Sequence, residues 1–163
     1  MIERTHKNSL KVFIDFVPNH VARQYKSDAK PKKAIDFGAD DDNTQNFLPD
    51  NNFYYIPGHR LELQFPVQEG DNTYVEDPAK ATGNDCFTYK PTKNDWYETI
   101  KLNYGVDYMN GRTPCFSLVP DTWEKMKAIL LYWAAKGVDG FRCDMAEMVT
   151  VEFWNWVIRK VKR

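Results

Sequence analysis

The sequence lacks the features that mark several large protein classes. Its three cysteines, Cys86, Cys115 and Cys143, form no C-x-x-C pair, which argues against a disulfide framework and a structural zinc site. Its 22 basic residues almost balance its 23 acidic ones, so the basic surplus of a nucleic-acid-binding protein is absent. Its apolar runs fall short of the roughly 20 residues that span a bilayer. The charged N-terminal residues have no apolar signal core, so we expect neither a membrane span nor a secretory signal.

Common nucleotide-binding and hydrolase motifs are missing as well. The sequence contains no G-x-G-x-x-G, Walker loop or G-x-S-x-G, and its three histidines have no H-x-x-x-H spacing. What it does have is 15% aromatic residues in a polar chain with a mean hydropathy of -0.64. These rings either form a wall on which sugars stack or build the core of a small domain that is poor in Leu and Ile. Those in the central part of the chain are Phe47, Phe53, Tyr54, Tyr55, Phe65, Tyr74, Phe87, Tyr89, Trp96, Tyr97, Tyr104 and Tyr108.

Proline and glycine divide the chain into three parts. All nine prolines lie between Pro18 and Pro120, so the two ends are regular and the middle is interrupted by turns. We therefore predict domain boundaries that give residues 1–20, 21–119 and 120–163. The middle part is expected to be a loop-rich insertion that folds as a small subdomain with a few short strands, one of them over residues 61–65.

The N-terminal part predicts a helix end followed by a buried strand. Residues 2–9 are expected to finish a helix, with Asn8 in the left-handed conformation that stops it. Residues 11–17 form an almost continuous apolar run, which is typical of a strand that is buried on both faces, as in parallel sheets.

The C-terminal part predicts a helix, a strand and a second helix. A helix that starts after Pro120 carries an apolar stripe and ends at Gly137; the stripe is formed by Trp123, Met126, Leu130 and Trp133. A strand over residues 138–144 follows, and Thr150 is expected to begin the last helix. Alternating strands and helices indicate an α/β fold in which the two predicted strands are parallel.

The second predicted strand carries the strongest chemical signal. In residues 138–144, VDGFRCD, side chains alternate between faces, which places Arg142 and Asp144 together and Phe141 with Cys143 on the opposite face. An arginine beside an aspartate favours the ionised carboxylate and fixes its direction, as a covalent nucleophile requires. Alternatively, the two residues form a structural ion pair.

The first predicted strand ends in polar groups. Asn19 and His20 can bind sugar hydroxyls, and an Asn carbonyl oxygen can bind Ca²⁺. Alternatively, Pro18 and Asn19 form a turn and His20 is a surface residue.

Together these motifs resemble those of one enzyme family. Residues 15–20, DFVPNH, resemble the first signature region of the α-amylase family of glycoside hydrolases, and residues 140–144, GFRCD, resemble its second. Residues 101–103, KLN, resemble the end of a signature found in the neopullulanase-like branch. This resemblance covers nearly the whole chain. It implies a partial (β/α)8 TIM barrel, strands 3 and 4 with their helices, interrupted by a domain B at residues 21–119.

The resemblance also assigns roles to single residues. Asp144 corresponds to the catalytic nucleophile and Arg142 to the arginine that orients it. Asn19 corresponds to a calcium ligand of many amylases, but Lys101 stands where those enzymes have an acidic ligand. Its ammonium group can replace the cation, and no cofactor is expected to be required. The predicted substrate-binding residues are His20, Asp15, Asn103 and Glu147.

The expected function is retaining hydrolysis of α-glucosidic bonds in starch-like glucans or maltooligosaccharides. A covalent glycosyl-Asp144 intermediate would form, and a second carboxyl group would act as acid and base. The resemblance places that acid–base glutamate after residue 163. We therefore expect the isolated chain to be inactive, and to self-associate through the exposed edges of an open barrel. The alternatives are a non-catalytic glycan-binding or scaffold protein with an amylase-like barrel, and chance matches in an unrelated α/β protein.

Overall fold

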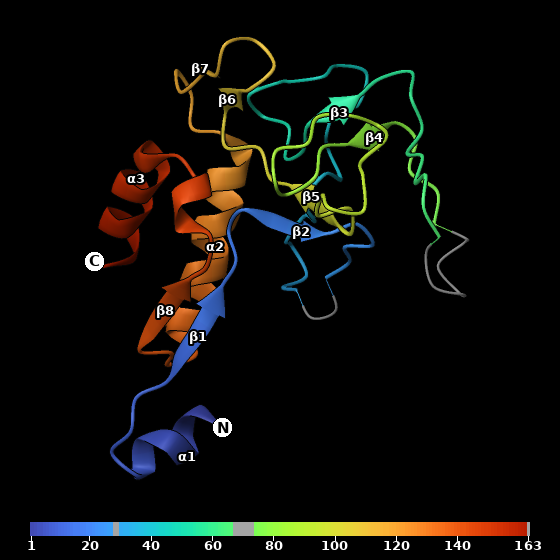
Figure 1. Cartoon of the computed structure of the whole chain (residues 1–163). Coiled ribbons are helices and arrows are strands. Elements are labelled where there is room, and N and C mark those ends of the chain that lie inside the picture. Colours follow the sequence, from blue (N-terminus) through green and yellow to red (C-terminus); the bar gives the residue numbers. More distant parts are fainter. Residues whose placement is uncertain (28–29, 67–73, 163) are drawn as a thin grey trace. The chain divides into compact units, whose positions relative to one another are not determined.

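The chain folds as two compact units in the computed structural model, which describes residues 1–27, 30–66 and 74–162 (Figure 1). The first unit consists of Met1–Asn19 and Trp123–Arg163, and the second of His20–Thr122. The predicted insertion at residues 21–119 thus falls inside the second unit. We describe each unit separately.

The first unit is built on two parallel strands. Strand β1 (Phe13–Phe16) pairs with β8 (Gly140–Cys143), and Asp15 lies opposite Arg142 in their register. The prediction that these two strands are parallel neighbours is therefore confirmed. Within the described residues this ladder has two strands and does not close into a barrel.

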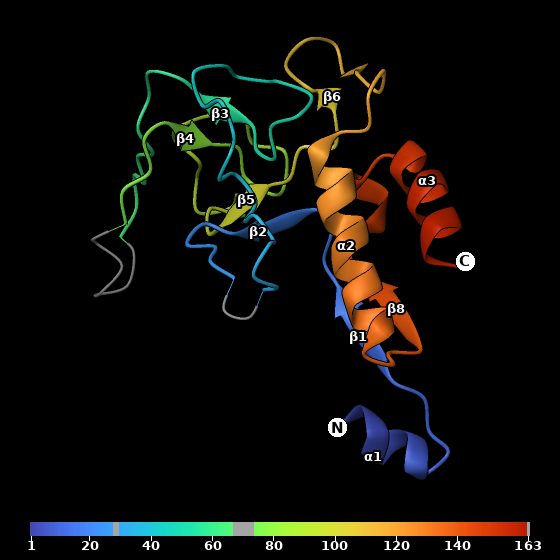
Figure 2. The ribbon, with the colours of Figure 1, turned by 180° about the vertical axis from the view of Figure 1, so that it is seen from behind.

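Helices complete the first unit. They are α1 (Ile2–Lys7), α2 (Asp121–Ala135), a short 3-10 helix η1 (Ala146–Met148) and α3 (Val151–Val161). Helix α2 lies against one face of the β1–β8 pair, as the two opposite views show (Figures 1 and 2). Its Trp123 packs on Phe153 of α3, with ring centroids 5.7 Å apart. The predicted stripe on α2 is only partly buried, because Trp133 at its end is 41% exposed.

Two backbone predictions for this unit need correction. The left-handed residue after α1 is Ser9, with φ of 58°, whereas Asn8 has φ of -100°. The strand predicted to be buried on both faces is open on one of them, because Phe13 is 64% exposed. Gly137 does stop α2 as expected; its φ of 91° lies in the region that glycine adopts without strain.

The second unit contains short antiparallel pairs joined by long loops. Strand β2 (His20–Ala22) pairs with β5 (Thr99–Lys101). The other pairs are β3 (Tyr55–Ile56) with β4 (Ala79–Lys80), and β6 (Val106–Asp107) with β7 (Thr113–Pro114). The predicted strand over residues 61–65 is wrong, because that segment has no strand conformation.

Aromatic side chains form much of the core of the second unit. Tyr54 is 1% exposed, and the rings of Phe47, Phe87 and Tyr108 lie within 6.0 Å of it, centroid to centroid. The core interpretation of the aromatic residues therefore holds for this cluster. The buried aromatic residues of the unit are Phe37, Phe53, Tyr54, Tyr55 and Tyr104.

An acidic run in this unit has a structural role. Asp41 accepts hydrogen bonds from the backbone N–H groups of Asn52 and Phe53, at 2.8 and 3.0 Å, and from the hydroxyl of Tyr55 at 2.9 Å. Asp42 accepts a bond from the backbone N–H of Thr44 at 2.9 Å. These carboxylates therefore fix the loop from which they project.

The buried tyrosines predict a loss of stability at high pH. Burial raises the pKa of Tyr54, Tyr55, Tyr74 and Tyr108, so these groups stay protonated in the folded chain when they ionise in the unfolded one. Their contribution is complete below the ordinary tyrosine pKa and is lost as the pH rises through the raised values. For a buried tyrosine this loss is at most about 1.4 kcal/mol per pH unit, and it is smaller for the half-buried Tyr74 and Tyr108. The lowered pKa of Lys101 opposes the loss over part of that range. Urea unfolding at increasing pH should show a falling free energy above about pH 10; an unchanged value would contradict the buried positions of these rings.

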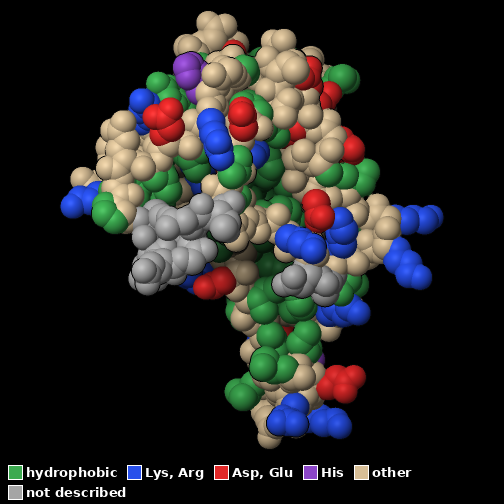
Figure 3. Space-filling model, turned by 90° about the vertical axis from the view of Figure 1, so that its right-hand side faces the viewer, with side chains coloured by type: hydrophobic (Ala, Val, Ile, Leu, Met, Phe, Trp, Pro, Cys, Tyr) green, Lys and Arg blue, Asp and Glu red, His purple; other side chains and the backbone are tan. Residues whose placement is uncertain are grey.

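The surface mixes charges of both signs with exposed apolar groups. Figure 3 shows basic and acidic side chains interspersed on the visible face, and hydrophobic side chains on the part that holds α1 and β1. Among the described residues no helix is both long and apolar enough to pass through a membrane.

Candidate active site

The end of β8 presents the predicted nucleophile. The backbone N–H of Asp144 donates to the carbonyl of Phe16 at 2.9 Å, which extends the parallel ladder by one bond. Immediately afterwards Met145 adopts a left-handed conformation, with φ of 51°, and the chain turns into η1. Asp144 is thus held at the carboxyl end of a parallel strand, the edge at which barrels and open α/β sheets place their active sites.

The Arg142 guanidinium lies between two carboxylates. One terminal nitrogen is 3.2 Å from Oδ1 of Asp144, and the other is 3.2 Å from Oδ2 of Asp15 on the neighbouring strand. Sequence reasoning predicted the first pair. The second follows from the parallel register, which sets Asp15 opposite Arg142.

The exposure of this group helps to distinguish its two interpretations. The side chains of Arg142, Asp15 and Asp144 are 66%, 63% and 38% exposed. Ion pairs this open contribute at most about 1 kcal/mol to folding, so stabilising the fold is a weak reason for the cluster. A planar guanidinium with fixed donors does orient a carboxylate, and this favours the interpretation of Asp144 as a nucleophile that Arg142 orients.

Two further predicted residues belong to the first unit. Glu147 lies in η1 and is exposed, whereas the side chain of Asn19 is almost fully buried. Their predicted roles, substrate contact for Glu147 and calcium binding for Asn19, stay predictions.

His20 and Asn103 belong to the second unit. His20 begins β2, lies opposite Lys101 of β5, and is half-buried. Its imidazole contacts the indole of Trp96, with ring centroids 5.5 Å apart and planes inclined by 63°. The role predicted for His20, contact with the substrate, stays a prediction.

Asn103 serves the scaffold of its unit. Its side chain is fully buried and donates to the carbonyls of Leu48 and Asn51, both at 2.8 Å, while its amide oxygen accepts from the N–H of Gly105 at 2.8 Å. The amide thus joins the backbone around residues 48–51 to that of Gly105. A direct contact with substrate, as predicted from the resemblance, is not favoured by this arrangement.

Lys101 is a cation inside the second unit. Its side chain is 2% exposed, and its Nζ lies 2.5 Å from Oδ1 of Asp85 and 4.9 Å from the ring centre of Tyr108. The Asp85 oxygen is buried, and the Lys101 ammonium is its ion-pair partner. Burial lowers the pKa of Lys101, and Asp85 partly offsets this effect. Nothing in the sequence pointed to Asp85, because an irregular loop supplies it.

These residues do not fit a calcium ion beside Lys101. Calcium takes six to eight oxygen ligands, including carboxylates whose charge balances its own. The carboxylate next to Lys101 is already neutralised by the lysine ammonium. Within residues 1–27, 30–66 and 74–162, no three His, Cys, Asp or Glu side chains are grouped so that they could hold a metal.

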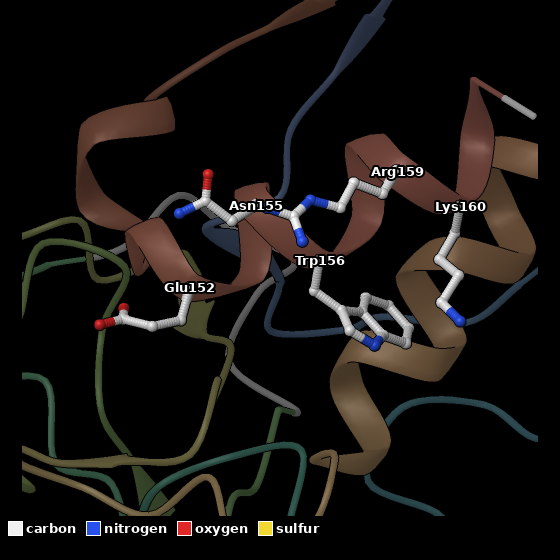
Figure 4. A pocket seen from close by; sticks show the side chains of 5 residues that line it. All are labelled: Glu152, Asn155, Trp156, Arg159 and Lys160. Atoms are coloured by element: carbon white, nitrogen blue, oxygen red, sulfur yellow. The ribbon is translucent and has the colours of Figure 1, made fainter.

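A hollow of about 490 Å³ on α3 provides no alternative site. Its five lining residues come from this one helix, and Trp156 points towards α2 (Figure 4). The indole of Trp156 packs against Trp123, with ring centroids 5.6 Å apart. The hollow is therefore a groove along a packed helix; its lining residues are Glu152, Asn155, Trp156, Arg159 and Lys160.

Comparison with known proteins identifies the family. Residues 1–159 match the family model of the α-amylase catalytic domain. The chain belongs to the α-amylase family. This confirms the resemblance inferred from the signature regions, and the family implies a (β/α)8 barrel.

Several curated proteins are similar to this chain. An alpha-amylase of Streptomyces lividans is 26% identical over 95% of the chain and 17% of its own length. An alpha-1,4-glucan:maltose-1-phosphate maltosyltransferase of Methylacidiphilum infernorum is 26% identical over 81% of the chain and 16% of its own length. A human protein named amino acid transporter heavy chain SLC3A1 is 24% identical over 91% of the chain and 18% of its own length. The chain thus spans less than a fifth of each of these relatives, and no solved structure matches it significantly.

Proposed function

We propose that this chain supplies the nucleophile section of a retaining enzyme that acts on α-1,4-glucans such as maltooligosaccharides. The observation that carries the proposal is the Arg142 guanidinium bound to both Asp15 and Asp144 at the end of β8. The names of the similar alpha-amylase and maltosyltransferase support the substrate class. The reaction needs a complete barrel that contributes the second carboxyl group.

Asp144 would act by forming a covalent bond to the sugar. One of its carboxylate oxygens attacks the anomeric carbon, and the bond from that carbon to the leaving oxygen breaks. The leaving oxygen takes a proton from the acid–base carboxyl group supplied by the rest of the barrel. Water, or the hydroxyl of another sugar, then gives its proton to that carboxylate and attacks the same carbon, which releases Asp144 with retention of configuration. Arg142 keeps Asp144 ionised and directed throughout.

We further propose that this section works without calcium. The buried ammonium of Lys101 already supplies a positive charge beside Asp85, so a divalent cation has no uncompensated carboxylate to bind there. Lys101 has no part in the chemical steps proposed for Asp144.

Activity measurements test the proposal. A complete barrel that contains these residues should release reducing ends from maltooligosaccharides, and NMR of the first products should show the α-anomer. The 163-residue chain alone should release none, because in this proposal the carboxyl group that protonates the leaving oxygen comes from another part of the barrel. Turnover by the isolated chain that disappears in Asp144→Asn would contradict the need for a second carboxyl group, and a complete barrel without activity would contradict the enzymatic proposal itself.

The isolated chain should also self-associate. The first unit exposes large apolar side chains and a two-stranded ladder, and both features favour association between copies. Light scattering at micromolar concentration should give a mass above the 19.1 kDa of one chain. A mass equal to one chain would refute this expectation. The exposed apolar residues of the unit include Leu10, Phe13, Val17, Trp133, Val151 and Ile158.

A second candidate function is a non-catalytic scaffold or glycan-binding protein. The similarity to the protein named amino acid transporter heavy chain SLC3A1 favours it, because that name describes no glycoside hydrolase. A complete barrel that binds maltooligosaccharides, but never forms a covalent sugar adduct on Asp144 detectable by mass spectrometry, would support this alternative.

A further inference from the structure

His20 lies in a frame made by three residues of the second unit. On one side the indole of Trp96 meets the imidazole, with ring centroids 5.5 Å apart in an edge-to-face arrangement. On another side the backbone of Gly83 approaches so closely that a Cβ built there would lie 2.9 Å from Cβ and 3.0 Å from Cγ of His20. Cβ contacts shorter than 3.0 Å are not tolerated, so this approach needs glycine, although Gly83 does not have a positive φ.

One hydroxyl group ties the two sides of the frame together. Thr99 Oγ1 accepts a hydrogen bond from the backbone N–H of Gly83 at 2.9 Å and donates one to the carbonyl of Trp96 at 2.7 Å. The backbone N–H of Trp96 donates in turn to Asn84 Oδ1 at 3.2 Å. Thr99 lies on β5, which pairs with the strand that begins at His20, so this hydroxyl and the imidazole belong to one small sheet.

We propose that Gly83, Thr99 and Trp96 are positioning residues that hold the His20 imidazole in the orientation needed to bind a sugar hydroxyl. The proposal rests on the proposed function, since the ligand of His20 is the hydroxyl of an α-glucan. An imidazole nitrogen binds a hydroxyl well only along a narrow range of directions, and a ring free to rotate would lose part of that bond. Trp96 acts through His20 in this scheme and does not touch the sugar.

NMR of the 163-residue chain tests the frame directly. The ring signals of His20 are those that disappear in His20→Gln, and His6 and His59 serve as internal references. Trp96→Leu removes the ring current of the indole, and Gly83→Ala forces the imidazole away, so both should shift the His20 ring signals while those of His6 stay in place. Trp133→Leu, on an exposed tryptophan of α2, is the matched control and should leave His20 unchanged. Unchanged His20 signals in Trp96→Leu would overturn the proposal.

Measurements of maltotriose binding then show whether Trp96 positions His20 or contacts the sugar directly. An edge-to-face aromatic pair contributes about 0.5–1.5 kcal/mol, so Trp96→Leu should weaken maltotriose binding roughly two- to tenfold. In a His20→Gln background the same change should have no further effect, because Trp96 acts only through the imidazole. An equal loss in both backgrounds would overturn the positioning role and make Trp96 a sugar contact. If the unchanged chain binds no maltotriose, sugar binding by this section fails, and the His20 signals alone decide whether the frame exists.

Discussion

Asp144→Asn should abolish glycosyl transfer in the complete enzyme, lowering kcat by roughly 10⁴-fold or more. The amide keeps the shape of the side chain and its contact with Arg142, but its neutral oxygen cannot form the glycosyl ester. The side chain of Asp144 is 38% exposed, so the loss of its ion pair should cost at most about 1 kcal/mol of stability. Steady-state kinetics on maltooligosaccharides and urea unfolding of the same variant measure the two effects.

Asp15→Asn is the matched comparison. Asp15 shares the guanidinium of Arg142 and is at least as exposed as Asp144, so a purely structural cluster predicts equal effects for the two variants. The proposed mechanism predicts a much smaller loss for Asp15→Asn, because Arg142 would still direct the remaining carboxylate. Similar activity losses in both variants would refute the nucleophile assignment.

The part of the site on regular strands could be predicted from the sequence. Side-chain alternation set Arg142 and Asp144 on one face, and the order of strands and helices made β1 and β8 parallel neighbours. The contact between Arg142 and Asp15 could not be predicted in this way. It depends on the register of the two strands, which side-chain alternation does not supply. The end of α2 at Gly137 could also be predicted, because it depends only on a backbone conformation that glycine adopts readily.

The second unit resisted prediction because loops set its contacts. Residues 61–65 alternate like a strand, yet Leu61 bonds to Glu76 and Glu62 bonds to Tyr89, so two different segments take the bonds that a ladder would need. The partners of Lys101 and His20, which are Asp85 and Trp96, also come from irregular backbone. Hydrophobic periodicity carries no information about such segments. The sequence therefore indicated that Lys101 takes the place of an acidic calcium ligand, but it did not indicate that Asp85 balances the charge of Lys101.

Removing one member of the Lys101–Asp85 pair should destabilise the second unit by about 3 kcal/mol or more. Asp85→Asn leaves the ammonium of Lys101, whose side chain is 2% exposed, without a counter-charge. The backbone is not strained by this change, because Asn tolerates the left-handed conformation of residue 85, with φ of 67°. Lys101→Met leaves the Asp85 carboxylate without a cation, but that side chain is 33% exposed and water can partly solvate it. Asp85→Asn should therefore be the more damaging of the two.

The double variant tests whether the two charges act as a pair. Lys101→Met with Asp85→Asn removes both charges, and replacing a whole buried ion pair by neutral groups is often close to neutral in stability. Urea unfolding followed by tryptophan fluorescence should therefore show the double variant to be more stable than either single variant. Simply additive losses would show that the contact does not couple the two residues.

The pH dependence of Asp85→Asn gives an independent check on the buried charge. Burial lowers the pKa of Lys101 in the folded chain, so between this value and the ordinary lysine pKa the unfolded chain binds more protons and stability rises with pH. Loss of Asp85 removes an interaction that raises this pKa, so the range in which stability rises should widen towards lower pH. The deficit of Asp85→Asn relative to the unchanged chain should shrink as the lysine becomes neutral. A deficit that stays constant with pH would show that the ammonium is hydrated.

The response to calcium also tests whether Lys101 takes the place of a metal ion beside Asp85. Addition of CaCl₂ or of a chelator should leave the unfolding midpoint of the unchanged chain where it is, because Lys101 already neutralises Asp85. Lys101→Asp places a second carboxylate in that position, and two carboxylates without a cation attract Ca²⁺. This variant alone should gain stability from CaCl₂, with Lys101→Met as the control that has neither cation nor added ligand. Stabilisation of the unchanged chain by CaCl₂ would contradict the replacement of the metal by the lysine.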